Sequence, residues 1–217
     1  MRDFRRPRAF EAVSQQQPAP ASICRAADLE RIFQAAFLQQ WRTCLRGGAA
    51  EPLYLPGREA GTPSTIFYRQ DFFASALHEV AHWCLAGASR RQQQDYGYWY
   101  APDGRNQNMQ QRFELVEQKP QALEYLFALA CGVPFRVSLD NLDGDIDAAR
   151  EQRFALAVCQ QAIQYCASDM PSRAATFLHA LCLHYGQFEH GVAKSAMLGH
   201  LQQAKCNLSL SDKACPL

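Results

Sequence analysis

Apolar side chains recur every three or four positions in several stretches of the chain, which is the spacing that places them on one face of a helix. The first such stretch has the apolar members Leu29, Ile32, Phe33, Ala36, Phe37, Trp41 and Leu45. Gly47 and Gly48 follow directly, and glycine commonly ends a helix. The pattern therefore predicts a first helix over residues 27–45.

Further stretches show the same helical spacing. One predicts a helix that begins at Asp71, as its N-cap, and ends at Gly87. Three more helices are predicted over residues 120–131, 148–167 and 173–185. After Gly186 the periodicity is lost, so we expect residues 187–217 to form a C-terminal tail.

Two short apolar runs, at residues 53–55 and 66–68, have the length of strands and are separated by prolines and glycines. A chain of 217 residues is long enough for one domain with a proper core and short of two. We therefore expect a single α+β domain, mostly helical, with a small sheet. Residues 1–22 are rich in Arg, Gln and Pro and predict a disordered tail, which leaves residues 23–186 as the central domain.

The composition is that of an ordinary globular protein, with 48% hydrophobic and 20% charged residues. The 22 basic and 21 acidic side chains nearly cancel, so the net charge of +1 gives no field that would indicate a nucleic-acid groove. No apolar run is long enough to cross a bilayer. We therefore expect neither nucleic acid nor a membrane as a direct partner.

Nine cysteines are scattered along the chain. Their number is odd, and no pair has the Cys-x-x-Cys spacing of a zinc knuckle or a redox motif. The chain also lacks the apolar segment of a secretory signal peptide. These features predict reduced, mostly buried thiols in a cytoplasmic protein.

The central helix contains His78, Glu79 and His82 in the pattern His-Glu-x-x-His. Positions i and i+4 lie one turn apart on one helical face, so both imidazoles can reach one metal ion. Glu79 lies beside them, where its carboxylate can contact a water molecule bound to the metal. The pattern predicts a metalloprotease-like metal-binding helix, although a motif this short also occurs by chance with all three side chains solvated.

A third ligand is expected from the acidic residues that follow. Glu117 is the better candidate because it directly precedes the predicted helix start at Pro120, and Glu114 is the alternative. Both are also explained as surface acids ahead of a helix N-terminus, where negative charge is favoured. Two histidines with one carboxylate leave coordination positions open, which suits hydrolytic zinc or oxygen-activating ferrous iron.

Other polar segments carry weaker signals. The acidic run at residues 140–147 does not fit an EF-hand calcium loop, because Leu139 and Arg150 would occupy positions that need carboxylates. It predicts a capped turn before a helix or, alternatively, a docking surface for a basic partner. Four aromatic residues could cover the core or form the wall of a pocket for a long cationic side chain: Tyr96, Tyr98, Trp99 and Tyr100. Core or surface roles are expected for the isolated histidines, which are His179, His184, His190 and His200.

Several longer blocks, in the same order, resemble those of the bacterial elongation factor P hydroxylases. They cover Glu51-Pro-Leu-Tyr-Leu-Pro56, Ala76 to Gly87 around the histidine motif, Asp95 to Arg105, Val116 to Leu123 and Ser138 to Asp145. Four long blocks are far more specific than the five-residue motif alone. The Arg/Gln/Pro-rich beginning and the cysteine-containing end depart from the family.

The resemblance implies a non-haem iron monooxygenase of translation, which uses molecular oxygen to hydroxylate the β-lysylated lysine of elongation factor P. It also implies a 2-His-1-carboxylate Fe(II) site, which maps onto His78, His82 and Glu117, with Glu79 tuning the open coordination positions or orienting a bound water. The motif by itself favours a zinc peptidase in which Glu79 is the general base. A non-catalytic module that binds a translation factor is the third alternative.

Overall fold

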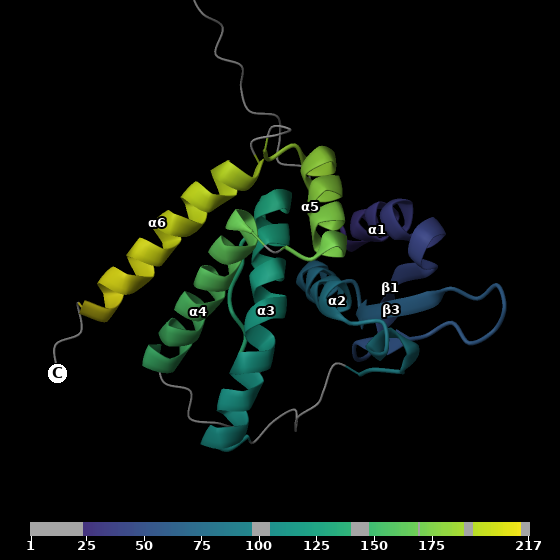
Figure 1. The fold of residues 1–217 in the computed structure, drawn as a ribbon, viewed down its shortest axis with the longest axis horizontal. Coiled ribbons are helices and arrows are strands. Elements are labelled where there is room, and N and C mark those ends of the chain that lie inside the picture. Colours follow the sequence, from purple (N-terminus) through teal and green to yellow (C-terminus); the bar gives the residue numbers. More distant parts are fainter. Residues whose placement is uncertain (1–23, 97–104, 140–147, 169, 189–192, 214–217) are drawn as a thin grey trace, which may run out of the picture.

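The computed structural model describes residues 24–96, 105–139, 148–168, 170–188 and 193–213 (Figure 1). Within these ranges the chain forms six α-helices, one short 3₁₀ turn (η1, Arg90–Gln92) and a three-stranded sheet. The prediction of a mostly helical α+β domain with a small sheet is thus confirmed. The expected tail at residues 1–22 lies outside the described ranges.

The sheet has the strand order β1-β3-β2, with β1 at Thr43–Ala49, β2 at Leu53–Leu55 and β3 at Ser64–Arg69. Strand β1 runs parallel to β3, and β2 pairs with β3 in the antiparallel sense. Strands β2 and β3 include both of the predicted apolar runs. Because β2 is an edge strand, its outer side is left facing the loop that follows the central helix, where Tyr54 and Asp95 form an isolated bridge.

Strand β1 corrects the predicted extent of the first helix. Helix α1 (Ala26–Trp41) ends before Leu45, because Arg42 adopts a left-handed conformation with φ of 46° and turns the chain into the sheet. Gly47 lies inside β1 and does not end a helix. A Cβ atom at this position would come within 2.7 Å of the Tyr68 side chain, so the close approach of the two strands requires glycine.

Helix α2 (Phe73–Leu85) is the predicted central helix with shifted ends. Phe72 occupies the N-cap position in place of Asp71, and no side chain accepts a hydrogen bond there. The helix ends before Gly87, because Ala86 already has an extended ψ of 123°. Neither predicted capping residue is therefore the one that the structure uses.

Helix α3 (Gln107–Cys131) begins far earlier than the predicted start at Pro120, which lies inside the helix. The N-cap is Asn106, whose side-chain oxygen accepts a hydrogen bond of 3.0 Å from the backbone N–H of Met109. Proline usually marks a helix start because it has no N–H to donate, and here the helix continues through it. As a consequence, Glu117 is held on a helix and not on a preceding loop.

Helices α4 (Ala148–Ala167) and α5 (Ser172–Tyr185) lie where the sequence predicted them. Residues 193–213, which were expected to lack regular structure, form helix α6 (Ala193–Lys213) alongside α4 (Figure 1). Met197 and Leu201 are fully buried, and the Cys159 thiol of α4 donates to the Leu201 carbonyl at 3.3 Å. Apolar residues do recur at helical spacing in α6, at Ala193, Met197, Leu201, Ala204 and Leu208, and the prediction overlooked them.

Aromatic side chains from four helices meet at the centre of the core. Trp83 of α2 packs edge-on against Phe33 and Phe37 of α1, with ring centroids 5.1 and 4.9 Å apart. Phe177 of α5 is fully buried and contacts Phe127 of α3 at 5.1 Å. This cluster fixes the orientation of α2 about its own axis. None of the described helices is both long and apolar enough to cross a membrane.

Candidate metal centre

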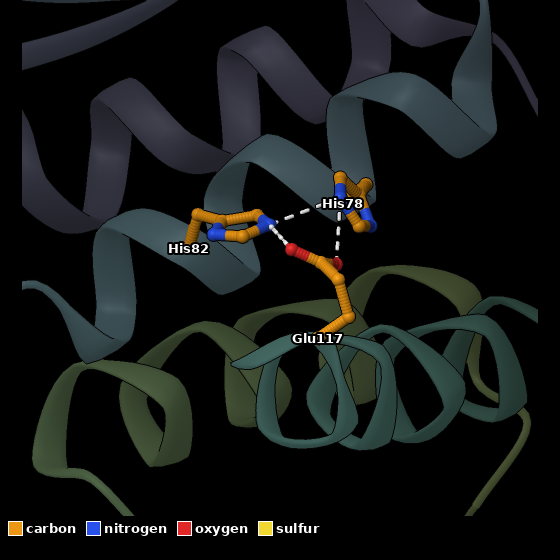
Figure 2. Close-up of side chains that lie close together, drawn as sticks. All are labelled: His78, His82 and Glu117. Carbon is orange, nitrogen blue, oxygen red and sulfur yellow. Dashed lines mark hydrogen bonds and ion pairs between the residues drawn. The ribbon is translucent and has the colours of Figure 1, made fainter. Parts of the chain in front are cut away.

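Two histidines one turn apart project from α2 toward α3 (Figure 2). The Nε2 atoms of His78 and His82 lie 3.0 Å apart, and about a quarter of each side chain is exposed. The helix presents them there because its opposite face carries buried Ala76, Val80 and Cys84 and packs into the core. The i,i+4 spacing predicted from the sequence thus brings both imidazoles to one point.

Glu117 of α3 faces the two imidazoles (Figure 2). Its Oε1 atom lies 3.3 Å from His82 Nε2, and its Oε2 atom lies 3.6 Å from His78 Nε2. The three side chains offer ligand atoms that all lie within 4.8 Å of one another. Glu114, the alternative from the sequence, instead pairs with Arg150 of α4 at 2.6 Å. The structure therefore brings Glu117 and not Glu114 to the histidine pair.

The chemistry of this cluster fits a transition-metal ion. Glu117 is 6% exposed, and its buried Oε2 atom has no hydrogen-bond donor among the described residues. A buried carboxylate oxygen without a donor is costly, and a cation at this point would remove that cost. Two imidazole nitrogens with one carboxylate suit zinc or ferrous iron, and three protein ligands leave coordination positions open.

A second carboxylate orients one of the histidines. Glu124 of α3 accepts or shares a hydrogen bond of 2.8 Å with His78 Nδ1, which leaves His78 Nε2 pointing at His82 and Glu117. Metal-binding histidines commonly donate their other ring N–H to a carboxylate in this way. Sequence reasoning missed Glu124. The signal was available, because positions 117 and 124 lie two turns apart on one helical face, but only if α3 is taken to begin before Pro120.

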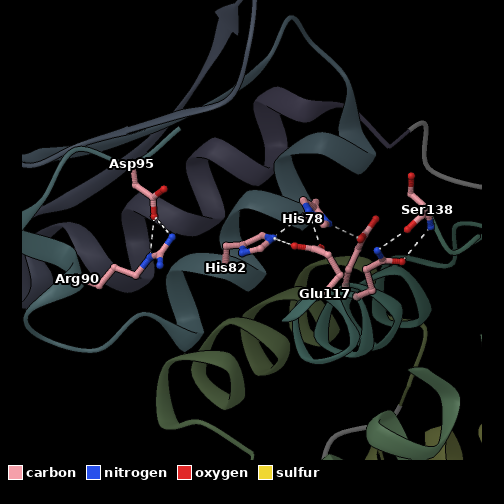
Figure 3. A network of polar contacts seen from close by, with 8 residues as sticks. His78, His82, Arg90, Asp95, Glu117 and Ser138 are labelled. Atoms are coloured by element: carbon pink, nitrogen blue, oxygen red, sulfur yellow. Dashed lines mark hydrogen bonds and ion pairs between the residues drawn. The ribbon is translucent and has the colours of Figure 1, made fainter. Parts of the chain in front are cut away.

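The polar network continues from Glu117 along α3 to the segment that follows this helix (Figure 3). Gln121 is 1% exposed and lies one helical turn after Glu117. Its amide also donates to the Ser138 carbonyl at 2.8 Å and accepts from the Ser138 N–H at 2.9 Å. Gln121 thus fixes the Ser138 backbone beside the cluster.

The electrostatics of the cluster are dominated by carboxylates. Burial opposes a charge on His78, but the charge of Glu124 and its hydrogen bond, with the charge of Glu117, raise the pKa of His78 to about 10. Burial also opposes a charge on Glu117, but the charge and hydrogen bond of His82 hold the pKa of Glu117 at about 2. An ion that binds here at neutral pH must therefore displace a proton from His78.

A cavity of about 360 Å³ opens beside the cluster. His82 and Glu117 form part of its wall, and the remaining wall comes from β2, β3, the loop after α2 and the N-terminal half of α3. Glu79 also lines it, and burial raises the pKa of this carboxyl. An ion held by the cluster would therefore have a space large enough for a substrate side chain next to it.

The end of α2 is held by a residue that the sequence did not indicate. Arg173 of α5 is 8% exposed, and its guanidinium donates to three carbonyl oxygens at the end of α2: Trp83 at 2.9 Å, Cys84 at 3.0 Å and Ala86 at 2.5 Å. The same group lies over the rings of Trp41 and Trp83, at 4.8 and 4.7 Å. A cation at a helix C-terminus is stabilising. Arg173 therefore stabilises the end of α2, which the sequence analysis had assigned to Gly87.

Of the remaining sequence candidates, those that the structure describes do not join the cluster. Tyr98, Trp99, Tyr100, His190 and the acidic run at residues 140–147 lie outside the described residues. Tyr96 is described and is half exposed, and its hydroxyl accepts a hydrogen bond of 2.7 Å from Gln94. The other histidines lie on α5 and α6: His179, His184 and His200. Among the described residues, three ligating side chains meet only at His78, His82 and Glu117.

Comparison with known proteins identifies a matching family and a similar relative. The profile of the family described as elongation factor P hydroxylase matches residues 32–195. A protein of Haemophilus influenzae named elongation factor P lysine hydroxylase is 42% identical over 158 residues, which cover 73% of this chain and 88% of the relative. The family match includes the whole of α2 and α3 and therefore every residue of the cluster.

Proposed function

The chain belongs to the elongation factor P hydroxylase family, and on that premise we propose that it hydroxylates a lysine side chain of translation elongation factor P. The relative's name supplies both the substrate protein and the lysine. The finer proposal, that this lysine carries a β-lysyl group, rests on the resemblance set out from the sequence. The observation that carries the proposal is the convergence of His78, His82 and Glu117 beside a cavity of substrate size.

We propose Fe(II) as the ion of this site, held by His78, His82 and Glu117. Two histidines and one carboxylate with open positions are typical of non-haem ferrous oxygenases. Bound iron supplies the activation of molecular oxygen, one atom of which enters a carbon–hydrogen bond while the other leaves as water with two electrons from a reductant. The residues themselves fix the geometry, because Glu124 orients the His78 ring.

The zinc peptidase remains the second candidate, because Glu79 lies next to the cluster and lines the cavity. In a peptidase this carboxylate must take a proton from the attacking water, so Glu79→Gln should cost on the order of a hundredfold or more in rate. In a hydroxylase no attacking water has to be deprotonated by a side chain. We therefore expect Glu79→Gln to retain the metal and a substantial fraction of product formation.

The test is mass spectrometry of elongation factor P incubated with the iron-loaded protein, a reductant and oxygen. We expect one added oxygen atom on the modified lysine with the wild-type protein. Glu117→Gln should lose iron and product together, because a neutral amide is a poor substitute for a charged ligand. Glu114→Gln is the matched control: it makes the same change on the same helix, at a carboxylate that pairs with Arg150, and should keep both.

Two outcomes would contradict the proposal. If the wild-type protein adds no oxygen atom but cleaves a peptide, the peptidase is correct. If Glu117→Gln keeps full iron and activity, the third ligand is assigned wrongly. Metal analysis needs anaerobic purification with added iron, because zinc binds such ligands more tightly and can displace iron.

A further inference from the structure

Two carboxylates outside the metal cluster line the cavity, and their surroundings differ. Asp95 forms an ion pair with Arg90, whose Nε and Nη2 atoms lie 2.7 and 2.5 Å from its Oδ2. Glu79 is half-buried on α2 and makes no hydrogen bond or ion pair with any residue in the described ranges. Asp95 is thus held in a close ion pair within the chain, whereas Glu79 makes no such pair among the described residues and is attracted only by the charges of His78 and His82.

Two other cationic residues of the cavity wall, Arg91 and Arg105, are engaged elsewhere. Arg91 donates to the Ala86 carbonyl, and its guanidinium lies over the Trp41 ring at 5.1 Å. Arg105 is 5% exposed and donates to Gln110 at 2.8 Å and to the Leu139 carbonyl at 2.9 Å. Lys119 is exposed on the opposite wall, which is formed by α3. None of these groups pairs with Glu79 in the part of the chain that the structure describes.

A half-buried carboxylate that accepts no hydrogen bond is unfavourable, and a ligand that brings positively charged donors would relieve this cost. The rest of the wall suits an aliphatic chain, because Ile66, Leu85, Val116 and Pro120 line the same cavity. A ligand that matches both features is a chain of methylenes that ends in a primary ammonium. Such a group has three donors and needs an acceptor with negative charge.

We infer that the carboxylate of Glu79 binds a primary ammonium group of the substrate side chain and so determines the specificity of the cavity for a charged amine. The inference rests on the proposed function, since it takes the lysine-type substrate from there. It assigns Glu79 to substrate recognition. Glu79 is then not the group that orients a water molecule at the open coordination positions of the metal. The neutral amide in Glu79→Gln keeps the size of the side chain and removes the charge that holds the ammonium.

The first measurement is steady-state hydroxylation of β-lysylated elongation factor P by the iron-loaded protein. We expect Glu79→Gln to raise KM by about tenfold or more while kcat changes by less than about threefold, because a charge-assisted bond to the substrate is lost. Glu114→Gln, a carboxylate outside the cavity, should change neither constant. A large fall in kcat with unchanged KM would show that Glu79 acts on the reaction and would overturn the inference.

The second measurement does not depend on the reaction. Binding of n-hexylamine, which is protonated at neutral pH, is compared with that of 1-hexanol by calorimetry on the metal-loaded protein. We expect the amine to bind the wild-type protein about tenfold or more tightly than the alcohol, and Glu79→Gln to abolish this difference. Equal binding of both compounds to the wild-type protein refutes the ammonium site. Amine preference without any hydroxylated product would instead refute the proposed function and leave the ammonium site standing.

Discussion

The two faces of helix α2 differ in how far the chain satisfies them. On one face, Trp83 is 4% exposed and meets Phe33 and Phe37 in edge-on contacts. On the other face, His78 and His82 point at each other and at a carboxylate oxygen that lacks a donor. The first face is complete without any ligand. The second is not, and this difference separates the residues that stabilise the fold from those that bind.

The same contrast holds energetically. Fully burying a large apolar side chain stabilises the fold by about 1.5–3 kcal/mol, and close packing adds to this. Polar groups brought together in a partly dry site give little net stability and cost more when a partner is missing. We therefore expect changes on the aromatic face to affect unfolding, and changes on the polar face to affect metal binding.

The largest effect is expected in the aromatic core against which this face of α2 packs. Phe177→Ala should lower the free energy of unfolding by about 3–5 kcal/mol, because it leaves a cavity among fully buried rings. The measurement is urea denaturation of the metal-free protein, with Leu183→Ala as the control. Leu183 lies on the same helix, is 62% exposed and should change stability by less than about 0.5 kcal/mol. Equal effects of the two changes would contradict the assignment of stability to the aromatic core.

Changes on the polar face of α2 should act mainly on metal binding. His82→Ala and His78→Ala should each weaken binding of the metal ion by on the order of a hundredfold or more, since each removes one of three ligands. His82→Ala should change the unfolding free energy of the metal-free protein by less than about 1 kcal/mol, because this side chain is partly exposed. His82→Ala is the cleaner variant, since His78→Ala also leaves Glu124 without its partner. If both variants keep one ion per chain, the site lies elsewhere.

A smaller effect is expected at Glu124, which contacts the ligand His78 and does not itself join the cluster. Glu124→Gln should weaken metal binding by about tenfold to a hundredfold, because the amide orients His78 less firmly. It should also change the pH dependence. In the wild-type protein, one proton leaves His78 for each ion bound, so the affinity should rise about tenfold per pH unit from neutral pH toward 10. Without the negative charge of Glu124 the pKa of His78 falls, and the affinity should level off at a lower pH.

The stability of the metal-free protein should follow pH in the opposite direction. The pKa of His78 is raised from its ordinary value of 6.5 to about 10, so its charged form contributes stability that is full below about 6.5 and is lost as the pH rises toward 10. The pKa of Glu117 is lowered, so its contribution is present above about 4.5 and is lost as the pH falls toward 2. Thermal melts across this range check both signs. A melting temperature that rises between pH 7 and 10 contradicts the assignment to His78.

Much of the site could be predicted because its central pair depends on a short local pattern. Helical periodicity alone places His78 and His82 on one face, and the resemblance supplied Glu117 as their partner. The histidine pair follows from information within one turn of helix. Helices α4 and α5 were predicted for the same reason, since their apolar positions recur regularly.

Apart from the overlooked helix α6, the errors share a cause, because each depends on a contact with a distant part of the chain. The end of α1 depends on β1 finding β3, a partner about twenty residues away. The end of α2 depends on Arg173. Glu124 was missed because Pro120 was taken as a helix start, and propensity cannot show that tertiary packing carries the helix through a proline.

The contact between Arg173 and α2 also has a consequence for biosynthesis. The guanidinium that holds the last carbonyls of α2 is encoded 90 positions after Trp83. While the chain emerges from the ribosome, the histidine pair is therefore made long before the group that fixes the end of its helix. The ion site can reach its final geometry only after α5 has left the exit tunnel, when most of the polypeptide has been synthesised. A nascent chain that is cut short before this point carries the His-Glu-x-x-His motif on an unfinished helix, so metal loading becomes a late step that reports on nearly complete folding.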